Sequence, residues 1–138
     1  MFLRDVAYVM VMSSSVHSSE AGGGGGLHAQ NASKVDITNS SVSSNTAQSD
    51  GGGLSATDTV SVVVAAEGSS VSSNTAAGMG GGLAALGNAT VALTGGSSVQ
   101  GNTSKKGGGA FAADSAKVAI TNNSGVHSSV AAWWWVAG

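Results

Sequence analysis

The chain contains no cysteine and no proline, and charged and aromatic side chains are scarce. Without cysteine it can form no disulfide bond and has no thiolate for metal binding or nucleophilic attack. Five basic residues stand against seven acidic ones, for a formal net charge of −2. This balance argues against a protein that binds nucleic acid by neutralising phosphates, and against a polybasic membrane-binding protein. The 138 residues suffice for one modest domain and are too few for two ordinary ones.

The N-terminal segment is only weakly apolar. Its apolar run, residues 6–12, is short, Asp5 offsets the charge of Arg4, and no small-residue cleavage pattern follows. The run is also far too short to cross a bilayer. We therefore expect neither a signal peptide nor a transmembrane segment here, and we interpret Val9 and Val11 as part of the first copy of a repeated strand.

Small residues make up most of the chain: serine (24), glycine (22), alanine (22) and valine (17) account for 85 of the 138 residues. Without a period, this composition would be typical of a disordered chain. Here it recurs about every 27 residues, counted between two landmarks. A glycine run ends at Gly26, Gly53, Gly82 and Gly109. A serine-rich segment is centred on Val16, Val42, Val71, Val99 and Val126.

Three apolar positions keep the same phase after each glycine run. They are occupied by Ala29, Ala56, Ala85 and Ala112, by Val35, Val62, Val91 and Val118, and by Ile37, Val64, Leu93 and Ile120. A period of two and β-branched residues predict strands after the glycines, through Val-x-Ile, and at Ser-Val-Ser. Repeats stacked on identical neighbours form solenoids. The sequence therefore predicts an all-β fold, a right-handed parallel β-helix of about four to five rungs with three short strands per rung.

Two features near the C-terminus leave alternatives open. An ungapped alignment places Ala110 with the leucines of the earlier repeats, whereas a shift by one places Phe111 there. We favour the shift, because a large apolar side chain belongs inside. Trp133–Trp135 break the pattern and are either a cap for the coil or the tail of a truncated or misread reading frame. We expect one β-helix domain over residues 1–138, with repeats over about 9–129 and a tryptophan-rich tail or cap at 130–138.

Two short motifs carry a family resemblance. A Gly-Gly-x-apolar tetrapeptide occurs at Gly52-Gly53-Leu54, Gly81-Gly82-Leu83 and Gly108-Gly109-Ala110-Phe111, and an apolar-x-x-Asn tetrapeptide ends at Asn45, Asn74 and Asn102. Their combination resembles the repeats of chlamydial polymorphic outer membrane proteins, within the wider class of right-handed β-helix, pectin-lyase-like proteins. The family usually has Phe where Val stands here, and the copies ending at Ser19 and Ser129 lack the Asn. The resemblance implies a surface-displayed passenger or adhesive solenoid and nothing catalytic.

Carboxylates are the first candidates for catalysis, because parallel β-helices often act on polysaccharides. Asn31, Asp58 and Asp114 share one repeat position, which Gly87 occupies in the remaining copy. Asp58 and Asp114 would lie two rungs, or about 10 Å, apart, at the outer edge of the roughly 6.5–9.5 Å found in inverting glycosidases. We favour a column of turns, because Asn, Asp and Gly are the residues that turns require. No catalytic, cofactor-binding or metal-binding residue is predicted.

The histidines predict no metal site. His17 and His127 share a repeat position but would lie four rungs, or about 19 Å, apart, so they cannot share a metal within one molecule. His28 stands alone.

The structural residues we single out are the glycines that end the runs and a column of asparagines. Asn45, Asn74 and Asn102 are predicted to stack at the bend after the Ser-Val-Ser strand. Asn tolerates left-handed backbone, and its amide can bond to amides above and below it. We favour the amide ladder, because glycine is abundant in the chain yet absent from this position.

The residues on either side of the Ser-Val-Ser valines would form a flat Ser-x-Ser outer face. That face solubilises a surface of low charge, which is the interpretation we favour, or it binds glycans or ice. The function that fits best is a non-enzymatic structural or adhesive module at the cell surface or outside the cell. The alternative is a carbohydrate-active β-helix, a fragment of a polysaccharide lyase or glycosidase. Expected partners are glycans or other surface proteins, and unpaired strand edges predict end-to-end self-association.

Overall fold

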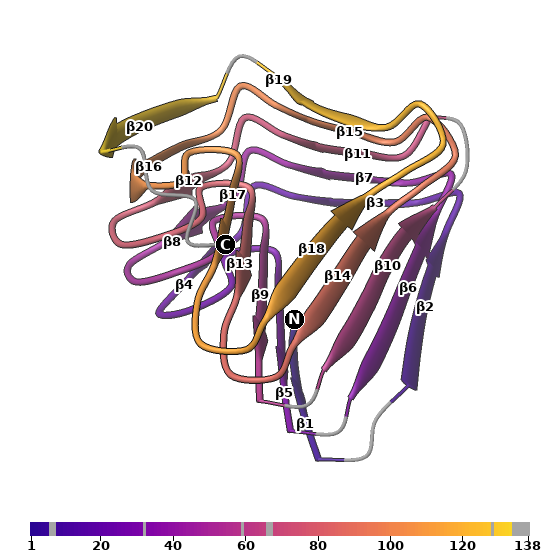
Figure 1. The fold of residues 1–138 in the computed structure, drawn as a ribbon, viewed down its shortest axis with the longest axis horizontal. Coiled ribbons are helices and arrows are strands. Elements are labelled where there is room, and N and C mark those ends of the chain that lie inside the picture. The colour runs from indigo at the N-terminus through magenta and orange to yellow at the C-terminus, as the bar shows by residue number, and fades with distance from the viewer. Residues whose placement is uncertain (6–7, 32, 59, 66–67, 128, 134–138) are drawn as a thin grey trace.

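The chain forms a parallel β-solenoid of about four turns in a computed structural model (Figure 1). The structure describes residues 1–5, 8–31, 33–58, 60–65, 68–127 and 129–133. Within these ranges, four parallel sheets of five strands each run along the solenoid, and each sheet takes one strand from every successive pass of the chain. The prediction of an all-β parallel solenoid is therefore confirmed.

The strands fall into sheets that we name A to D in chain order. Sheet A contains β1 (Phe2–Arg4), β5 (Leu27–Gln30), β9 (Leu54–Thr57), β13 (Leu83–Ala85) and β17 (Ala110–Ala112). Sheet B contains β2 (Tyr8–Met12), β6 (Lys34–Thr38), β10 (Ser61–Ala65), β14 (Thr90–Leu93) and β18 (Lys117–Ile120). Sheet C contains β3 (Ser15–His17), β7 (Ser41–Ser43), β11 (Ser70–Ser72), β15 (Ser98–Gln100) and β19 (Gly125–His127). Sheet D contains β4 (Glu20–Ala21), β8 (Thr46–Ala47), β12 (Thr75–Ala76), β16 (Thr103–Lys106) and β20 (Val130–Trp133).

The prediction of three strands per rung is wrong, because sheet D supplies a fourth. Strands β8 and β12 have only two residues each, too few to reveal an alternation of buried and exposed positions. Their threonines pair in register, Thr46 with Thr75 and Thr75 with Thr103. The sequence does contain a signal for this fourth strand. The tripeptide Asn-Thr-Ala or Asn-Thr-Ser recurs at Asn45, Asn74 and Asn102.

Strand pairing in the first and last turns adds to the predicted alignment at one end and corrects it at the other. Strand β1 pairs with β5, with Leu3 beside Ala29, so the repeat begins before residue 9. At the other end β17 pairs with β13 without a shift, which places Ala110 beside Leu83. The alignment that we favoured for Phe111 is therefore wrong. The main-chain ladder continues without a bulge, and Ala110 packs against the core while Phe111 lies beside Ala84, on the other face.

The core consists of columns of like residues in successive turns. Leucines of sheet A (Leu27, Leu54, Leu83), valines of sheet B (Val35, Val62, Val91) and valines of sheet C (Val42, Val71, Val99) are at most 3% exposed. Because these three columns each repeat one residue type, successive turns present a similar shape to one another there, whereas the column of Val11, Ile37, Val64 and Leu93 mixes three apolar types. Together these side chains form one buried apolar cluster along the coil.

The glycine runs lie directly against neighbouring backbone. The left-handed residue in each run is Gly24, Gly51, Gly80 or Gly107, two positions before the run ends. The glycines that end the runs have a different role. A Cβ added at Gly26 would lie 2.8 Å from the carbonyl oxygen of Gly53 and 2.9 Å from Nδ2 of Asn45. These positions exclude a side chain because the next turn and the asparagine column occupy the space.

One glycine run supplies both a test of this packing and its control. We expect Gly26→Ala to lower the free energy of unfolding by about 1–3 kcal/mol, as overpacking does. Gly22 opens the same run, and a Cβ there would meet nothing within 4 Å. Gly22→Ala should therefore change stability by no more than about 0.5 kcal/mol. Urea denaturation followed by circular dichroism measures both, and equal losses would contradict the packing account.

Candidate functional site

Three buried asparagines stack at the bend between sheets C and D. Nδ2 of Asn45 donates to Oδ1 of Asn74, and Nδ2 of Asn74 donates to Oδ1 of Asn102, each at 3.0 Å. The same oxygens accept the backbone N–H groups of Asn45 and Asn74. The three Nδ2 groups also donate to the carbonyl oxygens of Val16, Val42 and Val71. Each amide therefore joins its neighbour's side chain to the backbone of sheet C.

The left-handed backbone at this bend belongs to the residue before each asparagine. Ser44 and Ser73 both have a φ of 55°, and Gly101 has a φ of 62°, whereas the asparagines themselves have no positive φ. Backbone tolerance therefore does not explain why asparagine stands in the column. The hydrogen bonds that both ends of its amide make do explain it.

Adjacent residues at this bend separate the two explanations. Asn74→Gly and Asn74→Ala should each destabilise the fold by at least about 2 kcal/mol, because each leaves several buried donors and acceptors unpaired. Ser73→Gly should be neutral or stabilising by up to about 1 kcal/mol, because it relieves a left-handed non-glycine residue. Thermal and urea unfolding of the three variants test this. An Asn74→Gly variant as stable as the parent would contradict the ladder.

The carboxylates that we considered for catalysis occupy a column of turns. Asn31, Asp58, Gly87 and Asp114 have φ values of 61°, 66°, 69° and 62°, so all four are left-handed. The turn interpretation is therefore confirmed. Asp114 uses its carboxylate locally, because its Oδ2 accepts the N–H of Gly87 at 3.2 Å.

The structure keeps the histidines apart. His17 and His127 lie in the first and last strands of sheet C, with three strands between them. His28 stacks on Phe2 with the ring centroids 5.1 Å apart. Burial, together with the nearby N-terminal amine, lowers the pKa of His28. Within the ranges given above, no three His, Asp or Glu side chains gather closely enough to hold a metal ion.

The outer face of sheet C carries two rows of polar side chains. One row runs through Ser15, Ser41, Ser70 and Ser98 and ends at Gly125, which has no side chain, and the other runs through His17, Ser43, Ser72, Gln100 and His127. Neighbouring strands lie about 4.8 Å apart and alternate residues about 6.6 Å apart. Between the rows, the valines of β7, β11 and β15 point into the core. The result is a regular lattice of side chains on a rigid support.

The serine hydroxyls of this lattice have no partner among the described residues. The six are those of Ser15, Ser41, Ser43, Ser70, Ser72 and Ser98. Serines on the inner side of the adjacent bend differ, since Ser40 Oγ donates to the carbonyl oxygen of Thr38 at 2.8 Å and Ser97 Oγ to that of Thr94 at 2.6 Å. Inner serines thus stabilise the bend, and outer serines are available to a ligand. We call the six outer serines and their strands the serine face.

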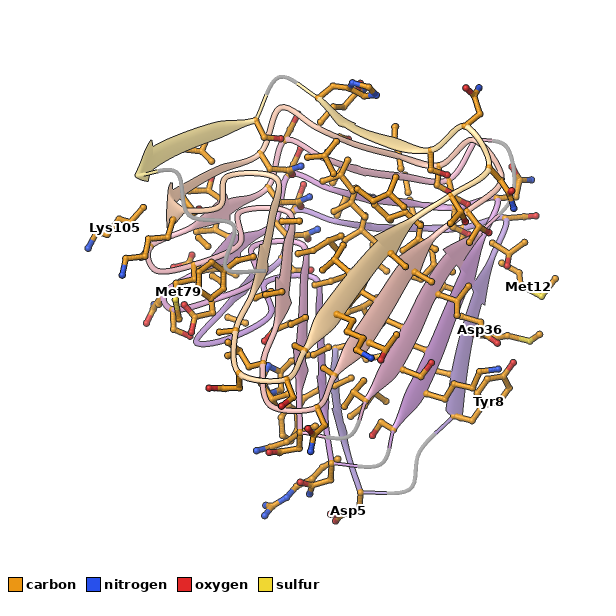
Figure 2. All side chains as sticks on the ribbon, in the orientation of Figure 1. Asp5, Tyr8, Met12, Asp36, Met79 and Lys105 are labelled. Carbon is orange, nitrogen blue, oxygen red and sulfur yellow. The ribbon has the colours of Figure 1, made fainter. Side chains whose placement is uncertain are left out.

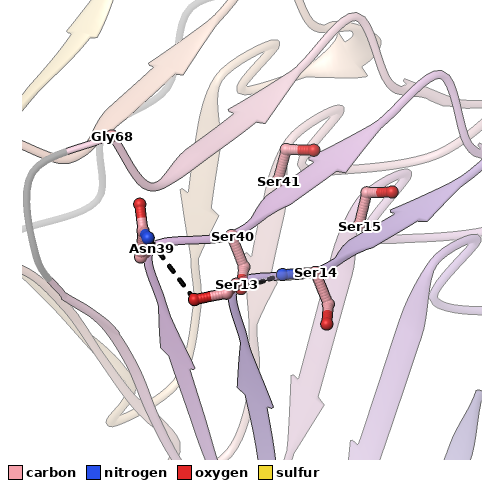
Figure 3. Close-up of a pocket in the computed structure, with 7 residues that line it drawn as sticks. All are labelled: Ser13, Ser14, Ser15, Asn39, Ser40, Ser41 and Gly68. Carbon is pink, nitrogen blue, oxygen red and sulfur yellow. Dashed lines mark hydrogen bonds between the residues drawn. The ribbon is translucent and has the colours of Figure 1, made fainter.

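A shallow hollow lies where the chain turns from sheet B into the serine face (Figure 3). It encloses about 410 Å³ and is lined by Ser13, Ser14, Ser15, Asn39, Ser40, Ser41 and Gly68. Asn39 Nδ2 donates to Ser13 Oγ at 3.4 Å, and the N–H of Ser14 donates to Ser40 Oγ at 3.1 Å. None of these side chains is charged, so the hollow extends the neutral hydroxyl surface around the corner.

A polar cluster that the sequence analysis missed lies on the outer face of sheet B. The hydroxyl of Tyr8 donates to Oδ2 of Asp36 at 2.7 Å (Figure 2). Lys34 Nζ lies 3.0 Å from the same oxygen and 5.1 Å from the centre of the Tyr8 ring. The hydrogen bond to Asp36, more than burial, raises the pKa of Tyr8. Burial would raise the pKa of Asp36, but hydrogen bonds from Tyr8 and Lys34 outweigh it and lower that pKa. The repeat register could have revealed this cluster. Tyr8 and Lys34 each precede an aligned valine, Val9 or Val35, and therefore lie side by side on neighbouring strands.

Tyr8 is the single tyrosine of the chain and reports on this cluster directly. We expect its phenol to ionise at a higher pH than that of a free tyrosine, and Asp36→Ala to shift the ionisation back toward the ordinary value. Because the folded-state pKa is raised, the hydrogen bond stabilises the fold below the ordinary tyrosine pKa, and this contribution is lost as the pH rises through the raised value. A spectrophotometric titration of phenolate absorbance measures the shift. Asp58→Asn, a remote loss of charge, is the control and should leave the titration unchanged.

In the described part of the chain, no helix is long and apolar enough to cross a membrane. No family model, no curated protein and no solved structure matches the chain. The likeness of its two repeat motifs to those of the chlamydial surface proteins therefore remains a resemblance, and the fold and surface chemistry carry the functional argument.

Proposed function

We propose that this chain is a non-enzymatic adhesive module, displayed at the cell surface or outside the cell, which binds neutral glycans along its serine face. The observation that carries the proposal is the lattice of six serine hydroxyls on the outer face of sheet C, which find no partner in the described part of the chain. The lattice repeats along the solenoid, so it fits an extended polymer that presents the same groups at regular intervals.

The chemistry of the face favours an uncharged, hydroxyl-rich ligand. A serine hydroxyl both donates and accepts, as sugar hydroxyls do, and the hollow beside the face adds further uncharged groups. Each hydrogen bond exchanged with water contributes only about 0.5–1.5 kcal/mol. Affinity must therefore come from many equivalent contacts along one polymer, which a repeating surface provides.

The asparagine ladder supports this function by holding the serine face in place. Its Nδ2 groups bond to the carbonyl oxygens of Val16, Val42 and Val71, which are the central residues of strands in the serine face. The lattice is thus organised before a ligand arrives, and less conformational entropy is lost on binding.

We also propose that the coil is right-handed and of the pectin-lyase-like type. Each sheet joins successive parallel strands through a connection that passes around the other three sheets. Connections between parallel strands of one sheet are right-handed in about 98% of cases. The Gly-Gly-x-apolar and apolar-x-x-Asn motifs favour the same type.

A triple variant tests the serine face. Ser41→Ala/Ser70→Ala/Ser98→Ala removes three hydroxyls from consecutive turns and leaves the main-chain pairing intact. Depletion isotherms with cellulose, chitin and mannan should show binding by the parent and at least about tenfold weaker binding by this variant, since three hydrogen bonds are lost. Thr46→Ala/Thr75→Ala/Thr103→Ala is the control, because it removes the same number of hydroxyls from the same turns in sheet D.

Two results would overturn the proposal. Equal binding by the serine and threonine variants would place the ligand elsewhere, and no binding of any of these polysaccharides would remove neutral glycans as the ligand class. Release of reducing ends from the polysaccharides, abolished by Asp58→Asn or Asp114→Asn, would favour the lyase or glycosidase alternative instead.

A further inference from the structure

We propose that copies of this chain stack head to tail, with strands β17 to β20 of one copy pairing in parallel with strands β1 to β4 of the next. The partner is a second copy of the chain, and the stacking is independent of the glycan binding proposed above. We call the contact between the last strands of one copy and the first strands of the next the joint. Three observations support it: the strand edges, the end residues of the core columns, and the outer side chains that meet across the joint.

All four sheets end in strands with one free edge at each end of the described solenoid. Sheet A ends in β1 and β17, sheet B in β2 and β18, sheet C in β3 and β19, and sheet D in β4 and β20. An edge strand presents a row of N–H and C=O groups to a further strand. Because each sheet is parallel throughout, translation of a second copy along the axis continues the same hydrogen-bonding pattern in every sheet.

The apolar columns of the core are partly exposed to solvent at both ends of the solenoid. Leu3, Val9 and Val16 are only partly buried at the first turn, while at the last turn Ile120 is 45% and Val126 37% exposed. In the observed register, a stacked copy places Val118 over Val9, Ile120 over Val11 and Val126 over Val16. Apolar residues then meet apolar residues in each of these columns, as they do inside the solenoid.

The outer side chains at the joint also match. Phe2 and Phe111 belong to one column, so the joint brings the two rings together, and Phe2 already stacks on His28 on its other side. Lys117 and Tyr8 share another column, which places a second ammonium beside a ring that lies next to Lys34. Aromatic pairs and cation–π contacts of these kinds are attractive.

One pair of like charges also approaches across the joint, Asp5 and Asp114. Both carboxylates are exposed to solvent, so salt screens the repulsion between them.

The joint is heterologous, because different surfaces of the two copies meet. Repetition of such a contact by translation along one axis does not close, so it generates an open filament. Sheet C then continues from copy to copy along the filament, and the serine faces of successive copies lie in line, separated by strand β19 at each joint.

Engineered cysteines test the register of the joint, since the parent chain has none. His17 and His127 occupy one column of sheet C, and the joint brings their Cα atoms to about 4.8 Å, within the range that a disulfide spans. The variant His17→Cys/His127→Cys should form a ladder of covalent multimers on mild oxidation, seen on a denaturing gel. The control His17→Cys/Gln100→Cys should form no ladder, because Gln100 lies in β15, between two strands of its own chain.

Sedimentation velocity supplies a second test that does not need cysteine. The mass of the parent should grow with concentration. Phe2→Glu/Phe111→Glu sets two like charges against each other at every joint and should require at least about tenfold higher concentration to associate, whereas Phe2→Glu/Phe111→Lys should restore association. Ser43→Glu/Gln100→Glu adds the same charge to inner turns and should associate like the parent.

Several outcomes would overturn head-to-tail stacking. A parent that stays monomeric up to about millimolar concentration (the upper range of such association) would do so, as would a Glu/Glu variant that associates like the parent. Equal multimer ladders from both cysteine pairs would show that oxidation is indiscriminate. Covalent dimers from His17→Cys alone would show that like ends meet. Glycan binding by a parent chain that stays monomeric would leave the proposed function standing while the stacking fails.

Discussion

The fold depends on one constraint: equivalent residues of successive turns must lie directly beside one another. The parallel main-chain hydrogen bonds impose this register in four sheets at once, and a slip of one residue would exchange the inner and outer faces of a strand. Every other feature follows from it. Columns of like residues form because each position meets its own counterpart, and the sequence need only provide residues that pack well against themselves.

This constraint explains why so small a set of residue types is sufficient. The interior columns hold valine, leucine, isoleucine and alanine, which are apolar side chains of modest size. Glycine allows the turn through Gly51 and the close approach of Gly53 to the next turn, two separate demands met by one residue type. Asparagine can stack in a buried column, because its amide offers a donor on one side and an acceptor on the other. Charge contributes little inside this arrangement, and the described ion pair, between Lys34 and Asp36, lies on the outer surface.

The sequence predicted the repeat, the parallel solenoid and the alignment of Val35, Val62 and Val91, because apolar positions at a fixed spacing directly reflect the register. It did not predict sheet D, since a two-residue strand such as Thr46–Ala47 has no period to detect. The choice of Phe111 over Ala110 failed because hydrophobic size was given more weight than the continuity of the backbone ladder. The sequence singled out Gly53 as a structural residue but did not show that its position lacks space for a side chain, because only the packing of the next turn reveals this. The cluster of Tyr8, Lys34 and Asp36 required knowledge of which outer positions are neighbours across strands.

The connections between sheets B and C vary in length, while the strands they join keep their register. Two residues separate β6 from β7, and four separate both β10 from β11 and β14 from β15. Insertions of one or two codons are therefore absorbed at this corner without disturbing any column. A duplication of one whole repeat would preserve every stacked pair and add one further turn, whereas a single codon gained inside a strand would reverse its faces. Descendants of such a gene can therefore change in length by whole turns, and their surfaces would lengthen without changing in chemistry.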